Sequence, residues 1–200
     1  MFVQVMEGKV RDAEGLRAQM DRWIRDLMPG ATGYLGSTGG VTDAGDCIMI
    51  ARFATEEAAR RNSDRPEQGS WWAETEACFD GPVRFHESTD VNVMKHGDAD
   101  KAHFVQVMEG HVSDRERARR LDAEADEILA TARPDLIESI TAYFDDGAYT
   151  DVAYFSSEEE ARAGEQRPMP EDMAPTMAEW EATMKVDRFL DIRDPWLTSA

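Results

Sequence analysis

The side chains best suited to chemistry are concentrated in one stretch of the chain, between residues 62 and 86. The stretch holds an amide, two guanidinium groups, two adjacent indoles and an imidazole, at Asn62, Arg65, Trp71, Trp72, Arg84 and His86. Indoles offer flat apolar faces, amides and guanidinium groups donate hydrogen bonds, and histidine has the unperturbed pKa nearest neutrality. Structural roles are the more common explanation for such residues: a Trp pair packs a core, an Arg-Pro step anchors a loop, and a lone strand histidine has a structural partner.

The elements that must position these side chains are encoded twice. The sequence FVQVMEGKVRD at Phe2–Asp12 returns as FVQVMEGHVSD at Phe104–Asp114, at an offset of 102 residues. The same offset aligns ARFATEEAAR at Ala51–Arg60 with AYFSSEEEAR at Ala153–Arg162. Two separate blocks in one register indicate a tandem duplication. We therefore predict two domains, residues 1–94 and 104–200, joined by a polar linker at residues 95–103.

The order of predicted elements is the same in both copies. In copy one we expect a strand at FVQVM, a helix capped by Asp12, and strands at 34–41 and 47–53. A helical stretch should then start at Thr55, be interrupted by an Arg-Pro loop and resume near Trp71, before a last strand at 83–87. In copy two we expect Ser113 and Glu116 to form a capping box, strands at 136–144, 150–155 and 186–192, and a helix resuming near Pro175.

This β-α-β-β-α-β order is typical of a ferredoxin-like unit, in which two helices cover one face of a sheet and the other face stays bare. The sequence therefore predicts an α+β fold. Two such units can bury their bare faces against each other, and a tandem duplication supplies both units in one chain. We expect an intramolecular α/β barrel.

The resemblance to a known family follows from three segments: the opening FVQVMEG, the ARFATEEAAR segment and the stretch RPEQGSWWAETEACFDGPVRFHES. Together they resemble the antibiotic biosynthesis monooxygenase (ABM) domain family of the dimeric α/β-barrel superfamily. The resemblance covers nearly the whole chain, apart from the linker and the last few residues, and implies the fold strongly. It implies the activity less specifically, because the superfamily includes cofactor-free quinone-forming monooxygenases, haem-degrading enzymes and isomerases.

The resemblance also implies roles for the residues in the chemical stretch. Family monooxygenases hold a phenolic substrate and stabilise its anion with Asn, Trp, Tyr and Arg side chains. Catalytic roles would then fall to Asn62, Trp72, Arg84 and His86, with His86 taking the phenolic proton. Substrate-binding roles would fall to Gln4, Arg65 and Trp71.

Gln4 and its equivalent Gln106 each place an amide among apolar neighbours on the first strand of a copy. A buried amide needs hydrogen-bond partners. The amide could orient a ligand, or it could tie the two sheets together, and its presence in both copies favours the second interpretation slightly.

The two copies differ where the chemistry would occur. Copy two has Gly164 in place of Asn62 and Leu190 in place of His86, so we expect the reactive pocket in copy one. The alternative is a second apolar pocket lined by Met173, Met177, Trp180 and Met184, although such a stripe is more often part of a core.

We expect no cofactor. A haem-degrading enzyme of this superfamily would have an Asn where Gln4 stands and a histidine on a helix, whereas His86 lies on a strand, so haem is disfavoured; His111 is the other histidine to test. Cys47 and Cys78 show no metal-binding spacing. The glycines between residues 33 and 40 form no phosphate-binding motif and indicate instead a bulge or a close approach of backbone or ligand.

Net charge and hydropathy argue against two further classes of function, nucleic-acid binding and membrane association. The net charge of −19 would repel nucleic acid or an anionic membrane, and no apolar run approaches the length of a spanning helix. We expect a cytoplasmic monomer with a pseudo-dimeric barrel that binds a small apolar or aromatic molecule, and leave a further homodimer open. Two functional hypotheses remain: a cofactor-independent monooxygenase acting on a small aromatic or polyketide-like compound, and a non-catalytic ligand-binding or stress-related module.

Overall fold

The computed structural model describes residues 1–168 and 173–200, and the chain divides into two compact units. The first unit contains residues 1–89 and 194–200, and the second contains residues 90–193. Each unit has one five-stranded antiparallel sheet. Among the described residues, no helix is long and apolar enough to span a membrane.

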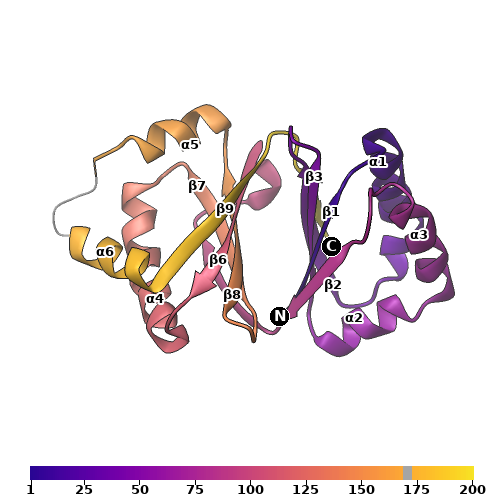
Figure 1. Ribbon diagram of the computed structural model, residues 1–200, viewed down its shortest axis with the longest axis horizontal. Coiled ribbons are helices and arrows are strands. Elements are labelled where there is room, and N and C mark those ends of the chain that lie inside the picture. The colour runs from indigo at the N-terminus through magenta and orange to yellow at the C-terminus, as the bar shows by residue number, and fades with distance from the viewer. Residues whose placement is uncertain (169–172) are drawn as a thin grey trace. The chain divides into compact units, whose positions relative to one another are not determined.

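The first unit covers one face of its sheet with helices α1, α2 and α3 (Figure 1). The strand order is β10-β2-β3-β1-β4. Its elements are β1 (Phe2–Lys9), α1 (Ala13–Arg22) with a following π-helical turn (Trp23–Leu27) and 3-10 turn (Met28–Gly30), β2 (Tyr34–Val41), β3 (Asp46–Phe53), α2 (Glu56–Ser63), α3 (Pro66–Glu76), β4 (Arg84–Ser88) and β10 (Trp196–Ser199).

The second unit repeats the arrangement with strand order β5-β7-β8-β6-β9. Its elements are β5 (Asp90–Lys95), a 3-10 turn (Ala99–Lys101), β6 (Phe104–Val112), α4 (Arg115–Ala132), β7 (Leu136–Tyr143), β8 (Ala148–Phe155), α5 (Glu158–Glu165), α6 (Ala174–Thr183) and β9 (Met184–Ile192). Helices α4, α5 and α6 lie on one face of this sheet (Figure 1).

The predicted ferredoxin-like order is confirmed in both copies, and each sheet gains one further strand. After β4 the chain enters β5, which pairs with β7 of the second unit, and after β9 it enters β10, which pairs with β2 of the first. The sequence boundaries at residues 94 and 104 follow the duplication, whereas the folded units exchange these two short strands. The predicted barrel depends on how one unit is placed against the other, so it stays a prediction.

The helix starts follow local capping chemistry. Asp12 caps α1 as predicted, because its Oδ1 accepts a hydrogen bond of 2.9 Å from the Gly15 N–H. In copy two the predicted Ser113 cap is wrong: Asp114, the equivalent of Asp12, accepts from the Arg117 N–H, and the Ser113 hydroxyl donates to the Thr183 carbonyl. Helix α3 begins at Pro66 rather than near Trp71, because proline is well suited to the first turn of a helix.

Candidate functional site

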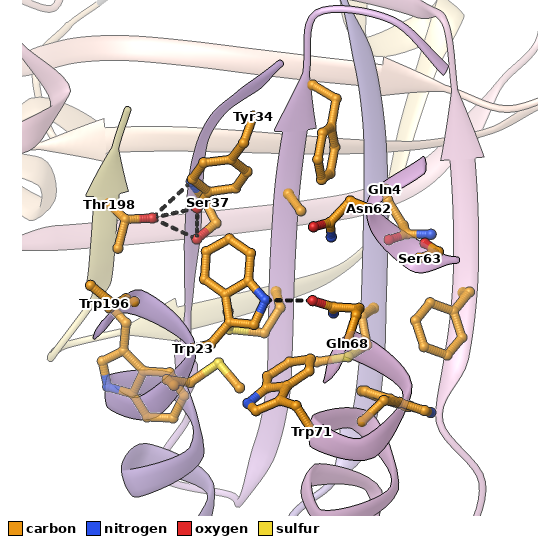
Figure 2. Close-up of a pocket in the computed structure, with 18 of the residues that line it drawn as sticks. Gln4, Trp23, Tyr34, Ser37, Asn62, Ser63, Gln68, Trp71, Trp196 and Thr198 are labelled. Carbon is orange, nitrogen blue, oxygen red and sulfur yellow. Dashed lines mark hydrogen bonds between the residues drawn. The ribbon is translucent and has the colours of Figure 1, made fainter. Parts of the chain in front are cut away.

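A cavity of about 300 Å³ lies in the first unit between the sheet and its helices. This volume is at the small end of the range for ligand pockets. Figure 2 shows its side chains converging from every layer of the unit. The lining residues are Gln4, Met6, Met20, Trp23, Ile24, Tyr34, Ser37, Met49, Ala51, Phe53, Asn62, Ser63, Gln68, Gly69, Trp71, Trp72, Phe85, Trp196 and Thr198.

Aromatic rings form a continuous wall along the cavity. Trp72 packs edge-to-face on Phe85 with ring centroids 5.2 Å apart, and it lies 6.1 Å from Trp71. The wall continues from Trp71 to Trp23 at 6.4 Å and from Trp23 to Tyr34 at 4.9 Å. Such tilted and edge-to-face pairs are the favoured geometries of aromatic side chains, so the wall is a rigid apolar surface. Its chemistry suits a flat aromatic ligand.

The polar side chains of the lining are almost all neutral amides and hydroxyls. Among the lining residues there is no Asp, Glu, Lys, Arg, His or Cys. The one group that titrates is Tyr34, and burial raises the pKa of its phenol, although hydrogen bonds with Ser37 and Thr198 oppose that effect. At neutral pH the lining is therefore uncharged.

Arg65 fixes the orientation of Asn62 without lining the cavity itself. Its Nη1 donates to Asn62 Oδ1 at 3.0 Å and to the Leu27 carbonyl at 3.0 Å. Because a guanidinium group only donates, the amide oxygen of Asn62 must face Arg65. The Nδ2 group of Asn62 is then the donor that it offers to a ligand oxygen. Arg65 thus positions Asn62, whereas the sequence predicted direct substrate contact.

A second amide, Gln4, is held by a cluster at the edge of the cavity. Its Nε2 donates to Glu87 Oε1 at 2.8 Å, and Arg60 Nη1 donates to the same oxygen at 2.7 Å. The Oε1 atom of Gln4 is its other polar group. Gln4 therefore lines the cavity while its amide nitrogen bonds within its own unit, and the hypothesis of a tie between sheets gains no support from these contacts.

Arg84 and His86 lie on the other face of the sheet, which contradicts their predicted place in the pocket. Strand β4 alternates, and its Phe85 side chain lines the cavity, so the residues on either side of Phe85 point away from it. Arg84 donates to Glu7 at 2.8 Å on that face, and His86 stands opposite Val5 in the register with β1. Four predicted site residues, Gln4, Asn62, Trp71 and Trp72, are brought together.

Several lining residues were not predicted from the sequence. Trp23 was not among the predicted site residues, and Tyr34 and Ser37 fell within the strand predicted at 34–41. Trp196 and Thr198 lie in a strand that belongs by sequence to the other copy, so no spacing rule placed them here. The one available signal was the glycine-rich sequence of β2, which indicates a bulge or a close approach of backbone or ligand.

At the positions equivalent to the cavity, the interior of copy two is polar. At the offset of 102, Asp151 takes the place of Met49 and Asp122 that of Met20. Burial raises the pKa of Asp151 to about 6, although hydroxyls of Ser139 and Thr141 donate to its Oδ1, each at 2.6 Å. The Tyr143 hydroxyl donates to Asp122 at 2.7 Å.

Other positions in the interior of copy two are filled as well. Gly164, which replaces Asn62, leaves no space for a side chain, because a Cβ there would lie 2.5 Å from both Arg133 and Asp135. The buried Tyr149 hydroxyl has no hydrogen-bond partner among the described residues. Trp180 and Met184 of the predicted stripe pack on the core with Tyr143 and Tyr149, whereas Met173 precedes α6.

Cofactor ligands are not grouped in the part of the chain that the structure describes. No three His, Cys, Asp or Glu side chains there are placed to hold a metal ion. His111 lies on β6 and bonds the exposed Asp187 at 2.6 Å, and His86 lies outside the cavity lining. Cys47 and Cys78 are both buried thiols without a disulfide, and burial raises the pKa of Cys47 to about 12.

Comparison with solved structures shows full-length chains of the same fold. A "putative monooxygenase" from Fusobacterium nucleatum superimposes with a TM-score of 0.76 at 9% identity, over 99% of this chain and 94% of that chain. A second "putative monooxygenase", from Lactobacillus acidophilus, gives 0.68 at 13% identity over 99% of both chains. An anthrone oxidase-like protein gives 0.68 at 11% identity, over 100% of this chain and 93% of that chain.

No protein-family model matches the sequence, and no curated protein matches it either. At identities this low the structural likeness is one of fold alone. At that level the comparison agrees with the predicted α+β fold of two tandem ferredoxin-like units.

Proposed function

We propose that copy one is a cofactor-independent monooxygenase site for a small aromatic or polyketide-like compound. The observation that carries the proposal is the cavity in the first unit, where an aromatic wall faces an amide donor held by Arg65. Trp71 and Trp72 would pack on the ring of the ligand. Asn62 Nδ2 would donate to the ligand oxygen. The names of the structural neighbours agree with this reaction class.

The proposed reaction converts a ring CH₂ group, or its phenol tautomer, and O₂ into a ring carbonyl and water. The substrate first loses its phenolic proton. The resulting anion then supplies electrons to O₂, and a carbon–oxygen bond forms to give a hydroperoxide. Loss of the remaining C–H proton and cleavage of the O–O bond release water and leave the carbonyl. Asn62 would stabilise the anion by donating to its oxygen, which is where negative charge develops.

The neutral lining determines how the first proton leaves. No lining side chain titrates near neutrality, so no protein group of the cavity is suited to act as general base. The proposal therefore requires a substrate acidic enough to lose its proton to water. His86, predicted from the sequence as the base, has no part in this mechanism because it lies outside the lining.

Oxygen uptake with a panel of phenols of graded acidity tests the proposal. We expect kcat/KM to rise with pH through the pKa of each phenol, and not through one pKa common to the panel. Removal of the donor in Asn62→Ala should lower kcat/KM by about 10²- to 10³-fold, the usual loss for one oxyanion donor. Trp72→Phe should also lower it, whereas His86→Gln should not.

Three outcomes of that experiment would contradict the monooxygenase. They are the absence of uptake with every phenol, unchanged uptake in both Asn62→Ala and Trp72→Phe, and a pH profile abolished by His86→Gln. Circular dichroism of each variant shows whether lost uptake reflects unfolding.

The second candidate is a non-catalytic module that sequesters an apolar aromatic molecule in the same cavity. The lack of any lining side chain that titrates near neutrality is the observation that favours it. This hypothesis predicts saturable binding of aromatic compounds with no oxygen consumed. Catalytic turnover of any bound compound would exclude it.

A further inference from the structure

One wall of the cavity is supplied by a strand from the opposite end of the chain. Strand β10 pairs antiparallel with β2, with Trp196 opposite Gly39 and Thr198 opposite Ser37. Both Trp196 and Thr198 line the cavity. Figure 2 shows Thr198 facing Tyr34 and Ser37, with Trp196 on the same strand. The site of copy one is therefore incomplete without residues from the C-terminal end of copy two's sequence.

Thr198, Tyr34 and Ser37 form a closed triangle of hydroxyl groups, here called the hydroxyl trio. The Tyr34 oxygen lies 2.6 Å from Thr198 Oγ1 and 2.7 Å from Ser37 Oγ, and the two Oγ atoms are 2.8 Å apart. The Ser37 N–H also donates to Thr198 Oγ1 at 3.1 Å, which fixes that oxygen on the backbone of β2. Burial keeps the Tyr34 phenol protonated by raising its pKa.

The hydroxyl trio can both donate and accept. When the three hydrogens run round the triangle, each oxygen donates once and accepts once within it. Thr198 Oγ1 also accepts from the Ser37 N–H, so the lone pairs of Tyr34 and Ser37 are the ones available to a ligand hydroxyl. When one hydrogen turns outward, the trio donates to a ligand carbonyl or oxyanion. The heavy atoms need not move for this change. The trio therefore suits a ligand oxygen that is a hydroxyl in one state and a carbonyl in another, as in a phenol and a quinone.

The sequence of β2 is fitted to the approach of β10. Gly36 has a φ of +145°, and a Cβ there would lie 2.5 Å from the Thr198 carbonyl oxygen, so any side chain would push β10 away. At the start of β10, the Arg17 guanidinium lies 5.2 Å from the Trp196 ring centroid and 3.6 Å from the Asp194 carboxylate. These contacts hold β10 against both β2 and α1.

Copy two lacks the hydroxyl trio although it keeps one of its members. Ser139 is the equivalent of Ser37, but Leu136 stands where Tyr34 would be. The strand that pairs there is β5, which places Met94 opposite Ser139. The trio is thus a property of copy one and of the strand that completes it.

We propose that β10 is the specificity-determining wall of the cavity, and that the hydroxyl trio of Thr198, Tyr34 and Ser37 binds one ring oxygen of an aromatic ligand. This inference rests on the proposed function insofar as the cavity must take an aromatic ligand. It adds that residues far apart in the sequence, on β2 and β10, recognise the oxygen of that ligand.

Calorimetric titration with 2-naphthol and naphthalene tests the inference without any turnover, because the two probes differ by one hydroxyl group. Wild-type protein should bind 2-naphthol about fivefold to tenfold more tightly than naphthalene, the worth of one hydrogen bond. Thr198→Val and Tyr34→Phe should each remove most of that preference and leave the affinity for naphthalene unchanged. Thr89→Val, an exposed threonine outside the lining, is the matched control and should keep the preference.

The outcomes separate this inference from the proposed function. If neither probe binds wild-type protein, both the aromatic site and the hydroxyl trio are wrong. Equal binding of the two probes, or a preference that survives in both Thr198→Val and Tyr34→Phe, would overturn the role of the trio and leave the aromatic site standing. A folded circular-dichroism spectrum is required of each variant.

Discussion

The helix-facing sides of the two sheets share a scaffold and differ in what they enclose. In copy one, Met20 and Met49 help to line an apolar cavity. In copy two, Asp122 and Asp151 occupy the same two positions, and both are buried and bonded to hydroxyl groups. The two copies therefore keep the same backbone plan and differ in the chemistry of their interiors.

Both copies keep one cluster of four side chains with the same contacts. In copy one Arg60 and Gln4 both donate hydrogen bonds to Glu87. The Arg60 guanidinium lies 5.6 Å from the Phe2 ring centroid. In copy two the same contacts join Arg162, Asp191, Gln106 and Phe104, with the cation 5.3 Å from the ring. Because the cluster ties the second helix to the first and last strands in both copies, we assign it to structure rather than to ligand choice.

The largest effect should come from truncating the aromatic wall. Trp71 is 7% exposed and its indole N–H donates to the Gln19 carbonyl at 2.8 Å. Trp71→Ala should lower the free energy of unfolding by about 3–5 kcal/mol, measured by urea denaturation. Trp180→Ala in copy two, where the indole is only half-buried, should cost less. Equal losses would show that the wall of copy one is no better packed than the helix of copy two.

A pH dependence should come from copy two. Because the pKa of Asp151 is about 6 in the folded protein and lower in the unfolded chain, the folded state binds more protons between those values. Its contribution to stability is complete below about pH 4 and is lost as the pH rises through about 6. Relative to Asp151→Asn, wild-type protein should therefore lose roughly 2–3 kcal/mol over this window.

Denaturant titrations of wild-type protein and Asp151→Asn at several pH values measure that difference. The asparagine retains an acceptor for Ser139 and Thr141 but does not titrate. Subtracting one curve from the other removes the carboxylates that act in the opposite sense, such as Glu87, whose pKa the Arg60 hydrogen bond lowers. A difference that stays constant across the window would contradict the buried acid.

A smaller effect should separate two tyrosines of copy two. Tyr143→Phe removes the donor to the buried Asp122 and should destabilise the protein by about 1–3 kcal/mol. Tyr149→Phe removes a hydroxyl without a described partner and should be neutral or slightly stabilising. Thermal unfolding of the two variants measures both. The reverse order would mean that Tyr149, and not Tyr143, belongs to the polar interior.

Much of the fold could be predicted because its signals are local. The repeat gave the number of copies, and alternation in FVQVM placed Gln4 and Met6 on one face of β1 and Val3 and Val5 on the other. Strand β2 was predicted with its observed bounds, Tyr34–Val41. The misplaced cap at Ser113 shows the limit of a motif: the equivalent of Asp12 was available one residue later.

The site was harder to predict because it depends on contacts between distant segments. Arg84 and His86 were grouped with Asn62 by proximity in sequence, and the alternation about Phe85 then placed them on the far face. Thr198 reaches the cavity through a strand exchange, which leaves no trace in the spacing of residues within one copy. Only the glycines of β2 gave a signal there, and it left a bulge, a ligand and another backbone as alternatives.

The most direct test of the central claim, that the ligand site lies in copy one, uses the equivalent alanines Ala51 and Ala153. Ala51 lines the cavity, whereas Ala153 is buried in the core with Phe104 and Phe155. Calorimetric titration with 2-naphthol should show a single site per chain, about tenfold or more weaker in Ala51→Leu and unchanged in folded Ala153→Leu. Full-strength binding to Ala51→Leu, or its loss in Ala153→Leu, would contradict the assignment.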